Sequence, residues 1–269
     1  MIAFADGLWT TDGAAPLADR GFTLGDGLFE TVLVIDGTPA RLSGHHARLA
    51  AGADALGFAP PPSAAELDAL AREIVAKNGL DQSRAAVRFS WTAGMSARGL
   101  SRILAPTGAL YATAAPAPRP GTPARLITSA IRRNETAPSA RWKTMSYIDN
   151  VIARREAETA GADEALLLNT QGRLAGAAAA CVLVALDDGA FATPPVSEGA
   201  LPSVTCAALV AAGAPIRTRP VSKEEFNAAP ALALVNALIG VRPALTLDGR
   251  PLDPAWPAFA PLMAALTPI

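Results

Sequence analysis

Cysteine and histidine are scarce in this sequence, with two of each among 269 residues. Cys181 and Cys206 lie in apolar surroundings, and no metal-ligand spacing surrounds either of them. Because a metal site needs several such side chains at suitable spacing, we predict no metal centre in this protein. Both cysteines are expected to be buried structural residues.

Charge and long apolar runs are also limited. Charged residues make up 17% of the chain and the net charge is -1, which argues against disorder and against nucleic acid as the main partner. One of the longest runs without charged or strongly polar side chains, 174–186, has 13 residues. A bilayer needs roughly 20. The first residues show no basic region typical of a secretory signal, so we expect a cytoplasmic protein without a membrane partner.

Apolar residues make up 51% of the chain, enough for a sizeable core in each of two small α/β lobes. The first third predicts a hairpin in which a strand at 28–35, an Asp-Gly turn and a return at 40–42 follow one another. Ser43 is expected to cap a helix, and a second helix spans 64–77. Strands are predicted at 86–91 and 109–115, joined by a polar loop that can carry binding residues.

The segment PAPRPGTP at 116–123 is rich in proline and shows no periodicity, which is typical of a linker. We therefore predict a small N-terminal domain at 1–115 and a larger C-terminal domain at 124–269. The second domain is also expected to be α/β. Its predicted elements are a strand at 125–129, a helix at 147–160, strands at 164–169 and 179–186, and a helix opened by Leu201-Pro202.

Lys143 lies among mostly neutral neighbours, directly ahead of the predicted helix at 147–160 and near the start of the second domain. A lysine that loses hydration becomes a usable amine nucleophile or base. Taken alone, a single lysine in a loop favours the alternative of a solvated charge, so a catalytic role depends on the rest of the sequence.

Four separate blocks resemble the class IV aminotransferases, which are the fold-type-IV pyridoxal phosphate enzymes. The blocks are ADRGFTLGDGLFET at 18–31, HHARL at 45–49, KTMSYIDN at 143–150 and ADEALLLN at 162–169. The resemblance covers nearly the whole chain. It implies a two-lobe α/β (α+β) fold like that of D-amino acid aminotransferase, with the cofactor between the lobes, and a homodimer whose active site a neighbouring subunit completes.

The resemblance also assigns roles to residues of this sequence. Lys143 matches the lysine that holds pyridoxal 5'-phosphate as a Schiff base and then moves protons. Arg48 matches the arginine that clamps the cofactor phosphate, and His45 stands one helical turn before it. Without the resemblance, Arg48 would be read as a surface charge. Val204 and Thr205 follow a leucine-proline turn whose backbone amides, at a helix N-terminus, also hold the phosphate.

Within the family, the sequence is most similar to aminodeoxychorismate lyases. Asn236 and Ala237, expected to face the cofactor, begin an Asn-Ala-Leu run where many aminotransferases carry a hydroxyl residue. Arg98 and Phe29 are implied to face a small amino substrate that bears a carboxylate. The alternative for Arg98 is an exposed arginine in a loop.

One departure from the family pattern bears on the chemistry. Gly176 stands where the family has the glutamate that pairs with the pyridine nitrogen of the cofactor, and no acidic residue lies between Glu164 and Asp187. Without that carboxylate the cofactor is a weaker electron sink. Transamination should suffer more than a lyase reaction whose aromatic product supplies its own driving force.

Other departures are Cys181 in place of a usual asparagine, Ser203 in place of a frequent glycine and Cys206 in place of a frequent arginine. Three hypotheses remain open. The first is a 4-amino-4-deoxychorismate lyase that releases pyruvate and 4-aminobenzoate for folate biosynthesis. The second is an amino acid aminotransferase of the branched-chain or D-amino acid type, and the third is a divergent non-catalytic paralogue.

Overall fold

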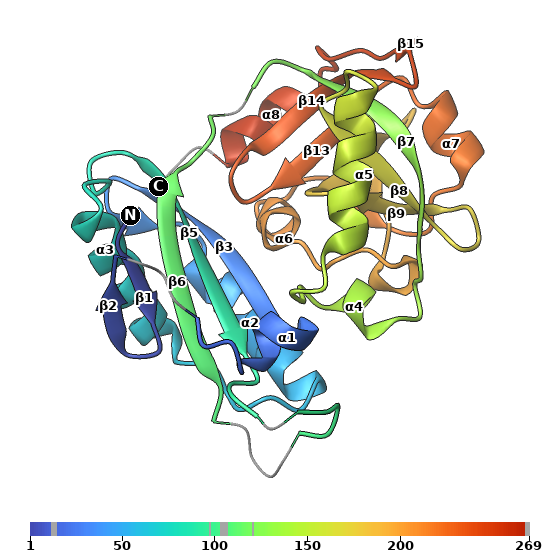
Figure 1. The fold of residues 1–269 in the computed structure, drawn as a ribbon. Coiled ribbons are helices and arrows are strands. Elements are labelled where there is room, and N and C mark those ends of the chain that lie inside the picture. The colour runs from blue at the N-terminus through green and yellow to red at the C-terminus, as the bar shows by residue number, and fades with distance from the viewer. Residues whose placement is uncertain (12–14, 97, 103–106, 120, 267–269) are drawn as a thin grey trace. The chain divides into compact units, whose positions relative to one another are not determined.

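The computed structural model describes residues 1–11, 15–96, 98–102, 107–119 and 121–266, and the chain folds as two compact units (Figure 1). Among these residues, the first unit holds 1–118 and 142–146, and the second holds 119–141 and 147–266. Position 120 of the expected linker lies outside the described residues. The five residues around Lys143, which the sequence analysis assigned to the C-terminal domain, pack with the first unit.

The first unit contains one antiparallel sheet with the strand order β2-β1-β6-β5-β3-β4. Its elements are β1 (Ala3–Ala5), β2 (Leu8–Thr10), α1 (Arg20–Leu24), β3 (Gly27–Ile35), β4 (Thr38–Pro39), α2 (Leu42–Ala55), α3 (Ala64–Lys77), β5 (Arg84–Thr92) and β6 (Ala109–Pro116). Asp36 and Gly37 have φ of 46° and 72°, which forms the tight turn of the expected hairpin.

The core of the first unit lies between the sheet and the two longer helices. Val32 and Val34 of β3 and Phe89 of β5 point to the same side, where they pack with Leu49 of α2 and Ile74 of α3. The period-two alternation of strands therefore leaves the other face of the sheet for polar and aromatic side chains such as Phe29.

Helix α2 begins differently from the prediction. Ser43 was expected to cap it, but Arg41 occupies the cap position with a φ of 54°, no side chain caps the helix, and Leu42 is the first helical residue. The left-handed Arg41 turns the chain directly from the hairpin into α2, so Ser43 already lies inside the helix.

The second unit contains a larger mixed sheet with the order β12-β11-β10-β13-β14-β7-β8-β9, and β15 pairs with β14. Its elements are β7 (Ala124–Arg133), α4 (Pro138–Arg141), α5 (Ile148–Thr159), β8 (Glu164–Asn169), β9 (Leu174–Ala177), β10 (Cys181–Ala185), β11 (Phe191–Thr193), the 3-10 helix η1 (Val196–Glu198), α6 (Val204–Ala211), β12 (Ile216–Thr218), α7 (Lys223–Ala228), β13 (Leu232–Asn236), β14 (Gly240–Leu247), β15 (Arg250–Pro251) and α8 (Phe259–Ala265).

Both faces of this sheet are buried. Along β13, Leu232 and Leu234 enter one apolar cluster together with Phe226 of α7, whereas Ala233 and Val235 enter a second cluster with α6 and α8. Helix α5 lies over β7 and β8 (Figure 1). No helix in the described part of the chain is long and apolar enough to cross a membrane.

Candidate active site

Lys143 lies on a short segment that runs along the edge of the sheet in the first unit. The backbone N–H of Phe29 donates to the Lys143 carbonyl at 2.9 Å, and the N–H of Met145 donates to the Gly27 carbonyl at 2.8 Å. The Lys143 side chain is half-buried, with Nζ 4.1 Å from the centroid of the Phe29 ring. The structure thus brings together two residues that the sequence places far apart, Lys143 and Phe29.

A second cation lies against the same ring, and the sequence analysis missed it. Cζ of Arg88 is 3.7 Å from the Phe29 ring centroid. Arg88 pairs with Thr31 across β3 and β5, and its side chain is exposed on the sheet face that carries Phe29. The only sequence signal was an arginine in the middle of an otherwise apolar strand. The arrangement places two positive groups beside one aromatic surface, which suits a substrate with a carboxylate.

Arg48 forms a bidentate ion pair with Glu30 of β3. Its Nε donates to Oε1 of Glu30 at 2.7 Å and its Nη2 donates to Oε2 at 2.6 Å. Nδ1 of His45 lies 2.7 Å from the same Oε2. The side chains of Glu30 and His45 are only 2% and 3% exposed. Glu30 therefore fixes the planes of both the guanidinium and the imidazole.

This cluster fits an anionic ligand. The buried Nε2 atom of His45 has no hydrogen-bond partner among the described residues, and a buried polar atom is normally satisfied. Burial acts to raise the pKa of Glu30, but the hydrogen bonds from Arg48 and His45 outweigh it and hold that pKa below its usual value. Glu30 thus stays ionised and keeps Arg48 oriented, as a phosphate clamp requires.

The second unit supplies a helix start whose N–H groups suit an anion, at the beginning of α6. The Ser203 side chain accepts from the Cys206 backbone N–H at 3.1 Å and caps the helix. Val204 and Thr205 are the first two helical residues, and Thr205 is buried. The N–H groups of a first helical turn have no intrahelical acceptor and point towards an anion. The helix begins at Val204, two residues after the expected Leu201-Pro202 opening.

Gly176 has an arginine beside it instead of a carboxylate. A side chain on Gly176 would meet the Ala180 carbonyl oxygen at 3.6 Å and Nη1 of Arg133 at 3.8 Å. Arg133 donates to the Gly199 carbonyl at 3.2 Å, and burial lowers its pKa. At the position where the family resemblance calls for a negative charge, this chain therefore has a half-buried cation nearby.

Asn236 is occupied within its own turn. Its Nδ2 donates to the Ala179 carbonyl at 3.0 Å, and its Oδ1 accepts from the N–H groups of Leu238 and Ile239. The side chain therefore shapes the turn between β13 and β14 and fixes the chain at Ala179. Ala237 lies at the tip of the same turn and is half-buried.

Arg98 lies in the loop after β5 and its side chain is exposed. Arg20 binds the backbone carbonyls of the two residues that follow Arg98. Its Nη1 donates to the Gly99 carbonyl at 3.1 Å and its Nη2 donates to the Leu100 carbonyl at 3.0 Å. Nε of Arg20 donates to Asp26 at 2.7 Å. Arg20 and Asp26, which both belong to the block at 18–31, thus anchor the loop that carries Arg98.

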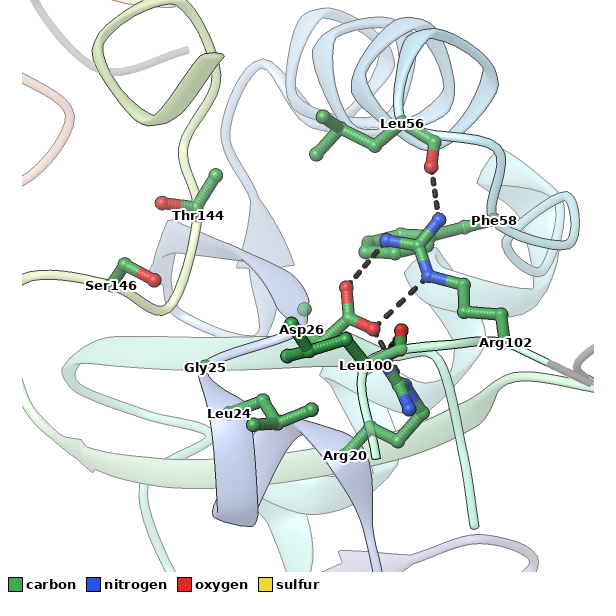
Figure 2. Close-up of a pocket in the computed structure, with 11 residues that line it drawn as sticks. Arg20, Leu24, Gly25, Asp26, Leu56, Phe58, Leu100, Arg102, Thr144 and Ser146 are labelled. Atoms are coloured by element: carbon green, nitrogen blue, oxygen red, sulfur yellow. Dashed lines mark hydrogen bonds and ion pairs between the residues drawn. The ribbon is translucent and has the colours of Figure 1, made fainter. Parts of the chain in front are cut away.

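Asp26 joins this anchor to a second arginine (Figure 2). Nε of Arg102 donates to Asp26 at 3.0 Å, its Nη1 donates to the Leu56 carbonyl, and its guanidinium stacks on Phe58. The cluster lines a pocket of about 530 Å³ in the first unit. The lining residues are Arg20, Leu24, Gly25, Asp26, Gly27, Leu56, Phe58, Leu100, Arg102, Thr144 and Ser146.

The predicted site residues are divided between the two units. Lys143, Phe29, Arg48 and Arg98 belong to the first unit, and the second holds Gly176, Val204, Thr205, Asn236 and Ala237. Within the described residues, no three His, Cys, Asp or Glu side chains gather in a way that could hold a metal ion.

A family model described as amino-transferase class IV matches residues 27–247 of this chain. A candidate branched-chain-amino-acid aminotransferase of Methanocaldococcus jannaschii is 26% identical over 253 residues, which cover 90% of this chain and 85% of that protein.

Two solved structures share the fold. A candidate 4-amino-4-deoxychorismate lyase of Legionella pneumophila has a TM-score of 0.87 and 26% identity, and the match covers 94% of each chain. The fold IV transaminase CpuTA1 of Curtobacterium pusillum has a TM-score of 0.82 and 28% identity over 96% of this chain and 90% of its own. Lyase and transaminase descriptions therefore both occur among proteins of similar identity.

Proposed function

Because this chain belongs to the class IV aminotransferases, which are pyridoxal phosphate enzymes, we propose that it is a 4-amino-4-deoxychorismate lyase that releases pyruvate and 4-aminobenzoate. The bound cofactor would supply the electron sink for the reaction. In this chain, Lys143 would hold the cofactor covalently and would then move protons during the reaction.

The phosphate-binding role falls to the groups that can meet an anion. Arg48 is held by Glu30, and Nε2 of His45 is buried with no hydrogen-bond partner in the described part of the chain. The amides of Val204 and Thr205 begin a helix. These groups would hold the cofactor phosphate by charge and by oriented N–H donors. Asn236 would act indirectly, through the turn that carries Ala237.

The single observation that carries the lyase proposal is the pair formed by Gly176 and Arg133. Among the described residues, no carboxylate lies within 4 Å of the position that a Gly176 side chain would take, whereas Arg133 does. A nearby cation opposes protonation of a ring nitrogen. Aromatisation of the product offsets a weak electron sink in the lyase reaction, whereas transamination has no such compensation.

The substrate would bind on the face of the sheet that carries Phe29. Arg88 and Lys143 both lie against that ring, and Arg98 lies in the loop anchored by Arg20. We infer that Arg88 meets a substrate carboxylate. Arg98 would bind a second carboxylate of the substrate, either in the active site of its own subunit or in that of a neighbouring subunit.

A homodimer is part of this proposal. Four large apolar side chains on α1 and the loop after β5 are exposed: Phe22, Leu24, Met95 and Leu100. They lie in one region. Asp19, which caps α1, forms an isolated β-bridge with Met95, and Leu24 and Leu100 line the same pocket. Exposed apolar patches of this kind mark protein contact surfaces. We infer a cytoplasmic dimer that acts in folate biosynthesis.

A product assay distinguishes the candidate functions. The purified protein, loaded with pyridoxal phosphate, is incubated with aminodeoxychorismate, and 4-aminobenzoate and pyruvate are measured. A separate reaction supplies branched-chain amino acids or D-alanine with a keto acid acceptor. The proposal predicts 4-aminobenzoate and pyruvate in equal amounts and little keto acid from the amino donors. If transamination dominates, the chain is an aminotransferase, as two of the relatives are described. If neither reaction gives a product, the result favours the non-catalytic paralogue.

A further inference from the structure

The two cysteines of the chain are neighbours in the second unit. Cys181 begins β10, and Cys206 lies in the first turn of α6. Cys206 belongs to the apolar cluster beneath α6 and α8, and Cys181 packs against that cluster. Each thiol is the largest influence on the pKa of the other. Two positions that depart separately from the family pattern are thus brought together by the fold as one pair.

The two thiols differ in reactivity. Cys181 is partly exposed, and its Sγ lies 3.1 Å from Oγ1 of Thr193. The hydrogen bond from Cys206 lowers the pKa of Cys181, and Thr193 assists against the opposing effect of burial. Cys206 is buried, and its hydrogen bond to Cys181 together with burial raises its pKa. Because a thiolate is the reactive form, Cys181 is suited to react first and Cys206 to follow.

We propose that Cys181 and Cys206 form an oxidisable dithiol site that a peroxide converts into an intramolecular disulfide. The Cys181 thiolate sulfur attacks one peroxide oxygen, so that an S–O bond forms, the O–O bond breaks and water leaves. The Cys206 sulfur then attacks the resulting sulfenic acid, so that the S–S bond forms, the S–O bond breaks and a second water leaves. Two thiols lose two electrons and two protons, and one hydrogen peroxide is reduced to two waters.

This proposal does not depend on the proposed function. The pair lies wholly within the second unit, and the reaction uses no group of the cofactor. The test can therefore be made on the folded full chain without pyridoxal phosphate, and a failed product assay would leave its outcome unaffected.

The experiment exposes the reduced, folded protein to hydrogen peroxide and follows it by thiol titration in denaturant and by intact mass. Because the chain has two cysteines, any intramolecular disulfide must be this pair. The expected result is a single chain, not cross-linked to another, that loses both titratable thiols and the mass of two hydrogen atoms. Dithiothreitol should restore both thiols. Persistence of both thiols, or addition of oxygen without loss of hydrogen, would overturn the proposal.

Single variants identify the order of reaction. Cys206→Ser should let peroxide convert Cys181 to a sulfenic acid that dimedone traps, because the second thiol is missing. Cys181→Ser should react more slowly with peroxide than Cys206→Ser, since it keeps only the buried thiol. Circular dichroism checks that both variants are folded. Equal rates for the two variants would contradict the assigned roles, and so would disulfide formation that is no faster in the folded protein than in urea.

Discussion

Single residues in this site owe their orientation to partners on other elements. The blocks around Lys143 and Arg48 could be predicted from the sequence, because each lies in a continuous motif. Glu30, which holds Arg48, was not singled out, because its role depends on a contact across eighteen positions between β3 and α2. Arg88 was missed for a related reason: a strand pattern does not say which distant segment covers a given face.

Glu30→Gln should destabilise the protein markedly. The substitution removes the negative charge between Arg48 and His45 and leaves a buried guanidinium without its ion pair, a change that typically costs about 3–5 kcal/mol. Urea unfolding at neutral pH measures the effect. Glu73→Gln, in the exposed pair with Lys77, is the matched control and should change stability by about 1 kcal/mol or less. An equally small effect of Glu30→Gln would contradict the role of Glu30.

The same carboxylate predicts a pH dependence. The folded-state pKa of Glu30 lies below its ordinary value of 4.5, so its contribution to stability is fully present above pH 4.5. That contribution should be lost as the pH falls through the folded-state pKa. The difference in unfolding free energy between wild type and Glu30→Gln should therefore shrink in acid, and a difference that grows in acid would be inconsistent with it.

Arg88→Ala should weaken substrate binding more than turnover. A hydrogen bond to a charged group contributes about 1.5–3 kcal/mol, which corresponds to a fall of roughly tenfold or more in kcat/KM. Most of that fall should appear in KM, because the arginine does not carry the proton. Steady-state kinetics on the carboxylate-bearing substrate is the measurement, and Arg72→Ala on the exposed face of α3 is the control. An unchanged KM would remove Arg88 from the substrate site.

At the scale of elements, local patterns predicted several of the longer helices and strands but not the pairings made over long distances. Helix α3 and strand β8 have the expected bounds, because a capping box and an apolar run define them locally. Strand β9 was not predicted, since Leu174–Ala177 is poor in β-branched residues and is a strand only through its pairing with β8. The segment around Lys143 likewise runs beside β3 through long-range backbone hydrogen bonds.

The backbone conformation of Gly176 in β9 limits which residues can replace it. Its φ of 134° is a conformation that side-chain-bearing residues avoid, so Gly176→Ala should destabilise the second unit by about 1–3 kcal/mol. Thermal unfolding measures this, with Gly121→Ala, where φ is not positive, as control. If Gly176→Ala unfolds at the same temperature as the wild type, the backbone at position 176 does not disfavour a side chain. A glutamate at this position would meet the same restriction, so simple reversion should not restore the family arrangement.

At the scale of the whole molecule, the first unit exposes an apolar patch. If the patch formed by Phe22, Leu24, Met95 and Leu100 is the dimer surface, Leu100→Glu should convert the protein to monomer. Sedimentation velocity measures the mass, and Leu8→Glu, at an exposed position on β2, is the control. A wild-type monomer, or a dimer unaffected by Leu100→Glu, would place association elsewhere.

The account as a whole depends on a covalent link between Lys143 and pyridoxal phosphate, and borohydride reduction followed by peptide mapping tests it directly. The chain has three lysines, at positions 77, 143 and 223, so each peptide is easily distinguished. The account predicts a yellow protein in which reduction fixes the cofactor on Lys143 alone, with Lys143→Ala colourless and Lys77→Ala unchanged. A folded wild type that stays colourless with excess cofactor, or label on Lys77 or Lys223 in place of Lys143, would contradict it.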